Sequence, residues 1–305
     1  MRVELVEVGP RDGLQNEART LDIDTRAELI RRLVDLGLRR LEAVSFVRPD
    51  RVPQMAGAEE VLAQLPVRDD VTYIGLVLNA RGAERAAATA CSEINIVVPV
   101  TDEFCARNQN TTVDGMLQHA ASAAAVGRDA GMSVSVTLAV AFGCPFAGDV
   151  PLSRVRDVYD RVADLGIDEI AFADTIGVGV PGQVSRMAEL VRRDSRVPRI
   201  RFHFHNTRNT GYANAAVASS LDGLGTIALD ASIGGFGGCP FAPAATGNIA
   251  TEDLTYLLQR DGVDIGTRLE IPAMTRVATW LADELDSPVQ GLLARAGDFP
   301  GGSLR

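Results

Sequence analysis

The sequence predicts an α/β fold, a (β/α)8 TIM barrel with extra C-terminal helices. Short apolar runs rich in β-branched residues recur along the chain, and each is followed by a stretch with the spacing of an amphipathic helix, which is the pattern of parallel β–α units. Eight such runs can be identified. The length of 305 residues suits a barrel, which takes roughly 250 residues, together with an extension at one end.

The eight predicted strands are short and mostly apolar. They are Val3–Val8, Arg40–Ser45, Val71–Leu76, Glu93–Val98, Ser133–Ala139, Glu169–Ala173, Ile200–His205 and Thr226–Ala231. The predicted helices between them include Thr25–Gly37, Val113–Ala130, Leu152–Leu165 and Pro181–Arg193. Eight strands that alternate with helices favour a closed barrel over an open sheet.

Capping residues support two of these helix boundaries. Asp24 is predicted to cap a helix that ends at Gly37, and Ser153 is predicted to cap one that ends near Gly166.

The segment after the eighth strand predicts further helices. Thr251 starts the first of two helical segments that reach about Glu284. We therefore expect a single domain over residues 1–305, with the barrel over about 3–262 and a helical extension over about 263–296.

Composition excludes two classes of partner. Hydrophobic residues make up 46% of the chain, but no stretch of about 18 uncharged apolar residues occurs, so we expect no membrane span. The net charge of −10 argues against nucleic acid, because binding to phosphates requires a basic face. An anionic substrate would need local arginines.

The cysteines indicate a reducing compartment. The four of them lie far apart and form no CxxC pair. Apolar alternation begins at Val3, which leaves no room for the charged and hydrophobic regions of a signal peptide. We expect a cytoplasmic protein.

All 30 basic residues are arginine, and none is lysine. Carbon–carbon lyases on barrels stabilise a carbanion with either a lysine Schiff base or a metal. For such a lyase, only the metal route would remain.

Two of the three histidines lie at the end of the seventh predicted strand, at His203 and His205. Side chains alternate along a strand, so both imidazoles face one side while Phe202 and Phe204 face the other. The imidazoles would project together into the barrel mouth, where they could bind one metal ion; the alternative is a pair of hydrogen-bonded core histidines. His119, in a polar helical stretch, is expected on the surface.

A charged, glycine-bounded run follows the first strand, where the catalytic face of a barrel begins. Asp12 is a hard oxygen ligand suited to Mg2+ or Mn2+, and Arg11 is a fixed cation that could pair with a developing enolate. Taken alone, the run could equally be an ion pair in a tight turn.

A glycine-rich loop follows the eighth strand, with four glycines among residues 234–238. Such a loop could move over a substrate. Cys239 could transfer a proton, and the amide oxygen of Asn248 could bind the metal. In isolation, a structural loop would be the better interpretation.

Together these segments closely resemble the 3-hydroxy-3-methylglutaryl-CoA lyase family of metal-dependent barrel lyases. The resemblance covers about residues 3–262, and the cysteine loop distinguishes the lyases from the related Claisen synthases. The matching segments are Val6–Glu17, Glu42 with Ser45–Val47, Val52–Met55, Asp174–Gly179, His203–His205 and Gly237–Leu254.

The resemblance implies roles for individual residues. The implied ligands of a divalent metal, most readily Mg2+ or Mn2+, are Asp12, His203, His205 and Asn248. The implied catalytic set is Arg11, Glu42, Asp174, His203 and Cys239. Gln15 and Ser45, within the matching motifs, are predicted to bind substrate. Sequence alone gives Glu42 and Asp174 a structural salt bridge with equal weight.

The implied activity is cleavage of a β-hydroxyacyl-CoA, either 3-hydroxy-3-methylglutaryl-CoA to acetyl-CoA and acetoacetate or a close analogue. His203 or Asp174 would take the hydroxyl proton, Arg11 would stabilise the enolate, and Cys239 would protonate it. The partner would be an acyl-CoA substrate, and a homodimer or larger homo-oligomer is compatible with the sequence.

The sequence departs from the family pattern directly after the second histidine, where Asn206-Thr207-Arg208-Asn209 replaces Asp-Thr-Tyr-Gly. Arg208 could bind a substrate carboxylate or a CoA phosphate, or lie on the surface. Asn206 favours a rival interpretation, a Claisen-type acyltransferase, because those synthases often carry His-x-His-Asn. A catalytically silent barrel that binds metal or CoA is a further alternative.

Overall fold

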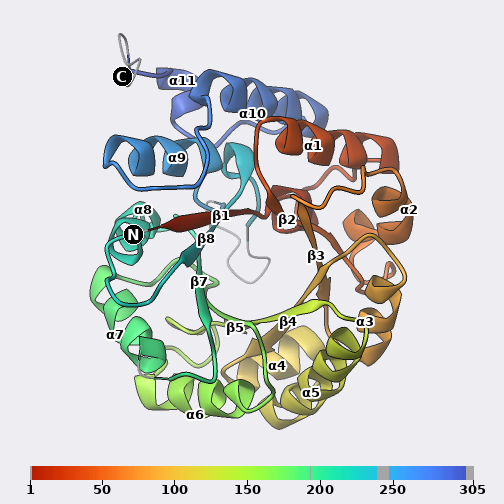
Figure 1. Cartoon of the computed structure of the whole chain (residues 1–305), viewed down its shortest axis with the longest axis vertical. Helices are drawn as coiled ribbons and strands as arrows, with labels where there is room; N and C mark the ends of the chain where they lie inside the picture. Colours follow the sequence, from red (N-terminus) through yellow and green to blue (C-terminus); the bar gives the residue numbers. More distant parts are fainter. Residues whose placement is uncertain (1, 193, 239–246, 300–305) are drawn as a thin grey trace.

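The computed structural model describes residues 2–192, 194–238 and 247–299. Eight parallel strands close into a barrel in the order β1 to β8, with β8 paired to β1, and helices surround it (Figure 1). The (β/α)8 fold predicted from the sequence is therefore confirmed.

All eight predicted strands lie within one residue of the observed ones at each end. The strands are β1 (Val3–Glu7), β2 (Arg40–Ser45), β3 (Thr72–Val77), β4 (Glu93–Pro99), β5 (Ser133–Ala139), β6 (Glu169–Asp174), β7 (Arg199–Phe204) and β8 (Ile227–Ala231). The predicted and observed bounds agree because the buried strands of a parallel barrel are short runs of apolar residues bounded by polar ones.

Helices cover the outside of the barrel and continue beyond β8. They are α1 (Ile23–Asp35), α2 (Ala58–Ala63), α3 (Ala80–Ala87), α4 (Asp102–Gln109), α5 (Val113–Asp129), α6 (Leu152–Ala163), α7 (Pro181–Arg192), α8 (Gly211–Ala218), α9 (Thr251–Arg260), α10 (Ile271–Leu285) and α11 (Leu293–Ala296). None of the helices in the described ranges is long and apolar enough to cross a membrane. His119 is exposed on α5, as predicted.

Both predicted helix caps are wrong. Helix α1 begins earlier than expected, and its N-cap is Asp22, whose Oδ1 accepts the N–H of Thr25 at 2.7 Å. Asp24 lies inside the first turn. Helix α6 follows Pro151 without a side-chain cap, so Ser153 is also inside the helix. Two candidate caps lie near α1, and local sequence does not reveal which one has the extended backbone that a cap requires.

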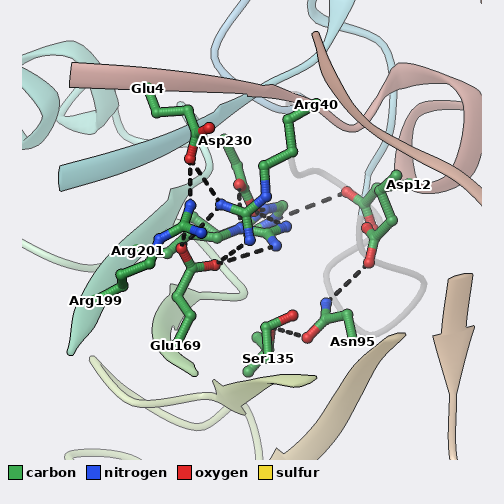
Figure 2. A network of polar contacts seen from close by, with 12 residues as sticks. Glu4, Asp12, Arg40, Asn95, Ser135, Glu169, Arg199, Arg201 and Asp230 are labelled. Atoms are coloured by element: carbon green, nitrogen blue, oxygen red, sulfur yellow. Dashed lines mark hydrogen bonds and ion pairs between the residues drawn. The ribbon is translucent and has the colours of Figure 1, made fainter. Parts of the chain in front are cut away.

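The barrel interior contains a column of buried charged residues. Near the amino-terminal ends of the strands, Arg40 donates to Glu93 at 2.7 and 3.0 Å and forms two bonds of 2.8 Å with Glu169. Figure 2 shows how the polar side chains continue from Glu4 through this layer toward Asp12. Barrel interiors are usually filled with bulky branched apolar residues. Here paired charges occupy that space, and their mutual hydrogen bonds offset the cost of burying them.

Candidate active site

A cavity of about 1960 Å³ opens at the carboxyl ends of the strands. Residues that follow or end several different strands line it, as in barrel enzymes generally. From the sequence-predicted set, the lining residues are Arg11, Asp12, Gln15, His203 and His205.

Asp12, His203 and His205 bring three potential metal-binding atoms together. These atoms lie within 4.8 Å of one another. Oδ2 of Asp12 is 3.8 Å from Nε2 of His203 and 3.9 Å from Nε2 of His205. Nε2 of His205 is buried without a hydrogen-bond partner among the described residues. An orphaned buried imidazole nitrogen is costly, and a cation between these atoms would satisfy it.

The strand geometry explains why both histidines face the same point. On the opposite face of β7, Phe202 and Phe204 are buried beneath the helices, with their rings stacked at 5.5 Å. The imidazoles therefore project into the barrel, with ring centroids 4.9 Å apart. The alternation predicted from the sequence is confirmed.

Each histidine is held through its Nδ1 atom by a different kind of acceptor. Nδ1 of His203 lies 3.0 Å from Oδ2 of Asp230, whereas Nδ1 of His205 lies 3.0 Å from the backbone oxygen of Asp174. Both acceptors favour the tautomer in which Nδ1 carries the proton and Nε2 has the free lone pair. The two Nε2 atoms are thus available to bind a metal.

Local charges favour the ligand forms of Asp12 and His205, whereas they favour the protonated form of His203. Burial raises the pKa of Asp12, but the adjacent Arg11 guanidinium and the two imidazoles outweigh it, so the pKa lies well below its usual range. Burial and the charge of His203 lower the pKa of His205 to about 4. For His203 burial lowers the pKa, but the hydrogen bond to Asp230 and the charge of Asp12 raise it overall. Ionised Asp12 and neutral His205 are the forms that bind a cation.

Arg11 joins the metal-binding cluster to a hydrogen-bond network. Its Nη1 donates to Oδ1 of Asp12 at 2.6 Å, and its Nε donates to Oε2 of Glu42 at 2.8 Å. The other oxygen of Glu42 accepts from Asn95 at 2.8 Å, and Thr137 donates to Asn95 at 2.9 Å. Glu42 is fully buried, so it acts through Arg11 and orients the guanidinium.

Asn248 lies beside Asp12 but presents its amide nitrogen to it. Nδ2 donates to Oδ2 of Asp12 at 2.8 Å and to the backbone oxygen of Phe236 at 3.1 Å. A half-turn of the amide would present the oxygen instead. The predicted ligand is therefore in place, and its ligation remains a prediction.

The structure places the other predicted residues away from the cavity lining. Both oxygens of Asp174 accept backbone N–H groups, from Val178 at 2.8 Å and Gly179 at 2.9 Å. Burial raises the pKa of Asp174, and these two hydrogen bonds partly offset the effect. Ser45 is buried, with no hydrogen-bond partner for its hydroxyl among the described residues.

Arg208 is exposed and forms hydrogen bonds with the loop that follows β6. Its Nη1 donates to the backbone oxygens of Ile176 at 3.0 Å and Gly177 at 3.1 Å. Cys239, the predicted proton donor, lies outside the described residues, so its role remains a prediction.

Four further polar residues that line this cavity were not predicted from the sequence. Each alternates with buried apolar residues along its strand, and that alternation could have identified them as inward-facing. They are Asn95, Thr137, Arg201 and Asp230.

Comparison with known proteins identifies the family. The HMGL-like family matches residues 2–279. The chain belongs to this family. The resemblance inferred from the sequence motifs is confirmed, and this HMGL-like protein is a carbon–carbon lyase of the HMG-CoA lyase family.

Two characterised lyases are about equally similar to this HMGL-like protein. An (R)-citramalyl-CoA lyase of Chloroflexus aurantiacus is 40% identical, with 97% of this chain and 95% of that protein covered. A hydroxymethylglutaryl-CoA lyase of Pseudomonas mevalonii is also 40% identical, with 90% of each chain covered. An HMG-CoA lyase structure from Acinetobacter baumannii, in complex with coenzyme A and 3-methylmalate, has a TM-score of 0.90 at 33% identity and covers 100% of this chain and 97% of that one.

Proposed function

We propose that this lyase requires a divalent metal, Mg2+ or Mn2+, and cleaves a short β-hydroxyacyl-CoA that carries a free carboxylate. The observation that supports this proposal is the convergence of Asp12, His203 and His205 beside Arg11 in the cavity. The two candidate substrates are 3-hydroxy-3-methylglutaryl-CoA and citramalyl-CoA, which differ by one methylene group between the hydroxyl carbon and the free carboxylate.

The mouth of the cavity suits a coenzyme A thioester. Arg48, Arg51, Arg81 and Arg107 line it and are exposed, although the chain as a whole carries a net charge of −10. Arg48 pairs with the exposed Asp50 at 2.6 Å, whereas Arg51 and Arg81 form no ion pair within the described part of the chain. A local cluster of guanidinium groups favours phosphate groups.

Four side chains of the cavity region would hold the metal. One carboxylate and two imidazoles would hold it, with the Asn248 oxygen as a fourth candidate, and this donor set suits Mg2+ or Mn2+. When bound, such a cation acts as a Lewis acid on hydroxyl and thioester oxygens.

The reaction breaks the bond between the hydroxyl-bearing carbon and the carbon next to the thioester. The hydroxyl loses its proton and becomes a ketone, and the electron pair of the broken bond passes to the thioester fragment as an enolate. Protonation of that enolate gives acetyl-CoA. The other product is acetoacetate from 3-hydroxy-3-methylglutaryl-CoA or pyruvate from citramalyl-CoA.

We assign the stabilisation of the enolate to Arg11 and its protonation to Cys239. Arg11 lines the cavity, and Glu42 holds its charge in a fixed position before the reaction begins. As a base for the hydroxyl proton, Asp174 has no oxygen free of backbone hydrogen bonds in this arrangement. His203 could accept the proton only while its Nε2 is not bound to the cation.

The orientation of Asn206 does not support the alternative hypothesis, a Claisen-type acyltransferase. Its Oδ1 accepts the N–H of Gly211 at 3.2 Å, which stabilises the start of α8. The residue that favours the synthase in the sequence therefore has a structural role.

Product analysis by mass spectrometry tests the proposal. The protein is incubated with Mn2+ and, separately, with 3-hydroxy-3-methylglutaryl-CoA, (R)-citramalyl-CoA and (S)-citramalyl-CoA. We expect acetyl-CoA with the matching keto acid from at least one of them. A reverse incubation with acetyl-CoA and each keto acid, monitored for free CoA thiol, detects a synthase. Release of free thiol without lyase turnover, or no product from any of the three substrates, would contradict the proposal.

A further inference from the structure

We infer that Asp230 and Arg201 are positioning residues for His203, and that this buried pair sets the affinity of the metal site. The inference rests on the proposed function only in requiring that Asp12, His203 and His205 bind a divalent cation. It concerns two residues that neither ligate the metal nor belong to the motifs that identify the family.

The contacts place Asp230 between two consecutive inward-facing residues of β7. Its Oδ2 accepts from Nη2 of Arg201 at 2.9 Å and lies 3.0 Å from Nδ1 of His203. Its Oδ1 accepts from Nε of Arg201. One carboxylate is thus held on two sides by Arg201 and presents a fixed acceptor to the histidine.

This arrangement fixes the tautomer of His203. An ionised carboxylate only accepts hydrogen bonds, so Nδ1 of His203 must carry the proton and Nε2 must have the free lone pair. Rotation of the ring is prevented by the same contact. Nε2 is consequently held 3.8 Å from Oδ2 of Asp12, facing the point that a shared cation would occupy.

The role of Arg201 is to hold Asp230 stationary. Asp230 is 3% exposed and Arg201 is 0% exposed. Two parallel hydrogen bonds from one planar guanidinium, to Oδ1 and Oδ2, fix the orientation of the carboxylate. Oδ2 therefore stays directed at Nδ1 of His203.

The two histidines therefore differ in their support. His203 is held by a charged side chain that substitution can alter, whereas His205 is held by the backbone oxygen of Asp174. A carboxylate acceptor makes the imidazole a more basic metal ligand than a carbonyl does. Removing the charge of Asp230 should therefore weaken metal binding through His203 alone.

The test is the dissociation constant of Mn2+, measured by electron paramagnetic resonance on the substrate-free protein. We expect Asp230→Asn to raise the dissociation constant by about 10- to 100-fold, which is the usual effect of losing such a supporting carboxylate. The control is Glu93→Gln, which removes an equally buried carboxylate that pairs with Arg40 and accepts from Ser135 at 2.7 Å. Glu93 lies in the same barrel without touching a histidine, so its loss should leave Mn2+ binding within about two-fold of the unsubstituted protein.

A second variant provides a control for misfolding, because Asp230→Asn removes the charge that Arg201 contacts most closely and leaves only Glu169 at 3.8 Å. Asp230→Asn combined with Arg201→Gln removes both charges, and we expect the same weakening of Mn2+ binding. Nitrogen NMR of His203 should show a single protonated Nδ1 in the unsubstituted protein and a mixture of tautomers in both variants.

Three outcomes would overturn the inference: unchanged Mn2+ affinity in the double variant, an equal loss in Glu93→Gln, or an absence of Mn2+ binding by the unsubstituted protein. If Mn2+ binding depends on Asp230 while no acyl-CoA is cleaved, the inference stands and the proposed function fails.

Discussion

Arg11 and Glu42 form a buried ion pair in which Nε and Nη2 of the guanidinium both donate to one carboxylate oxygen. The remaining nitrogen, Nη1, reaches Asp12. The arginine is thus oriented before any substrate binds. Preorganised charge of this kind stabilises a transition state without a cost of reorganisation.

Arg11→Ala should lower kcat far more than it raises KM. The assigned role is to stabilise an enolate that exists only after the carbon–carbon bond begins to break. Loss of such a partner typically costs on the order of 3–4 kcal/mol, or about 10²- to 10³-fold in rate. Arg11→Lys should be impaired too, because lysine cannot supply the planar fork that engages Glu42 and Asp12 together. Steady-state kinetics measures both parameters.

Arg208→Ala provides the contrast with Arg11. Arg208 is exposed and donates to two backbone oxygens of the loop after β6. We expect its loss to change KM or substrate preference, or to have no effect, with kcat unchanged. A normal kcat with a raised KM in Arg11→Ala would place Arg11 among the binding residues instead.

Chelation should abolish activity, and Mg2+ or Mn2+ should restore it. His205→Ala should weaken Mn2+ binding strongly, because Nε2 of His205 is buried and has no protein partner among the described residues. The matched control is His119→Ala, which removes an exposed imidazole on α5 that lines the same cavity but is not among the grouped metal-binding atoms, so Mn2+ binding should be unchanged. Full turnover in rigorously metal-free protein would rule out the proposed mechanism.

The sequence predicted the barrel because strand periodicity is local. It also predicted that His203 and His205 share a face, since that follows from alternation along one strand. It could not predict that Asp230 holds His203, or that Asn95 holds Glu42, because these pairs join different strands and depend on register and depth in the barrel. Long-range partners of a buried polar residue are set by tertiary packing.

The motif could not show how the side chain of Asp174 is oriented. Its carboxylate accepts two backbone N–H groups, and its backbone oxygen orients His205. Each carboxylate oxygen can accept a further hydrogen bond, so the role of Asp174 as a base remains a prediction. Its partners come from the loop after β6 and from the end of β7, and tertiary packing sets them.

Cys239→Ser should lower turnover while leaving Mn2+ and substrate binding largely intact. The assigned role is proton transfer, and a hydroxyl has a far higher pKa than a thiol. Cys91, Cys105 and Cys144 are buried, so alkylation of the native protein should act mainly through Cys239 if that thiol is accessible. An unchanged rate in the Ser variant would mean that Cys239 is only a structural loop residue.

Gly237→Ala should weaken metal binding. Gly237 has a φ of +100°, and a β-carbon there would lie 2.7 Å from Nδ2 of Asn248 and 2.9 Å from the backbone oxygen of Asp12. The added methyl group must therefore displace two predicted ligands or their backbone. We expect a rise of roughly 10-fold or more in the Mn2+ dissociation constant.

Gly262→Ala is the matched control for Gly237→Ala. Gly262 also has a positive φ, +74°, but a β-carbon there meets nothing within 4 Å. It should lower the thermal midpoint through backbone strain and leave Mn2+ binding unchanged. Equal effects of the two variants on Mn2+ binding would attribute the loss to strain alone.

Two buried carboxyl groups beside the loop after β8 should contribute less to stability as the pH rises from about 5 to about 8. His205 acts in the opposite direction up to its unfolded pKa of 6.5, because its folded pKa is lowered to about 4. Glu7 accepts from the backbone N–H groups of Gly9 at 2.8 Å and Ile233 at 2.9 Å, and Glu252 accepts from Gly234 at 3.0 Å. Burial raises the pKa of Glu7 from 4.5 to about 7 and that of Glu252 to about 8.

The sign follows from the direction of these shifts. The folded state binds these two protons more tightly than the unfolded chain does, so their contribution to stability is complete below the unfolded pKa of 4.5 and is lost as the pH rises through about 7 for Glu7 and about 8 for Glu252. For Glu7 the loss is on the order of 3 kcal/mol.

Urea unfolding between pH 5 and pH 9 measures this pH dependence of the free energy of unfolding. Glu7→Gln, which mimics the protonated form, should flatten the profile, whereas Asp50→Asn, at an exposed carboxylate paired with Arg48, should leave the slope unchanged. An identical slope in Glu7→Gln and the unsubstituted protein would mean that Glu7 is already ionised in the folded state at neutral pH.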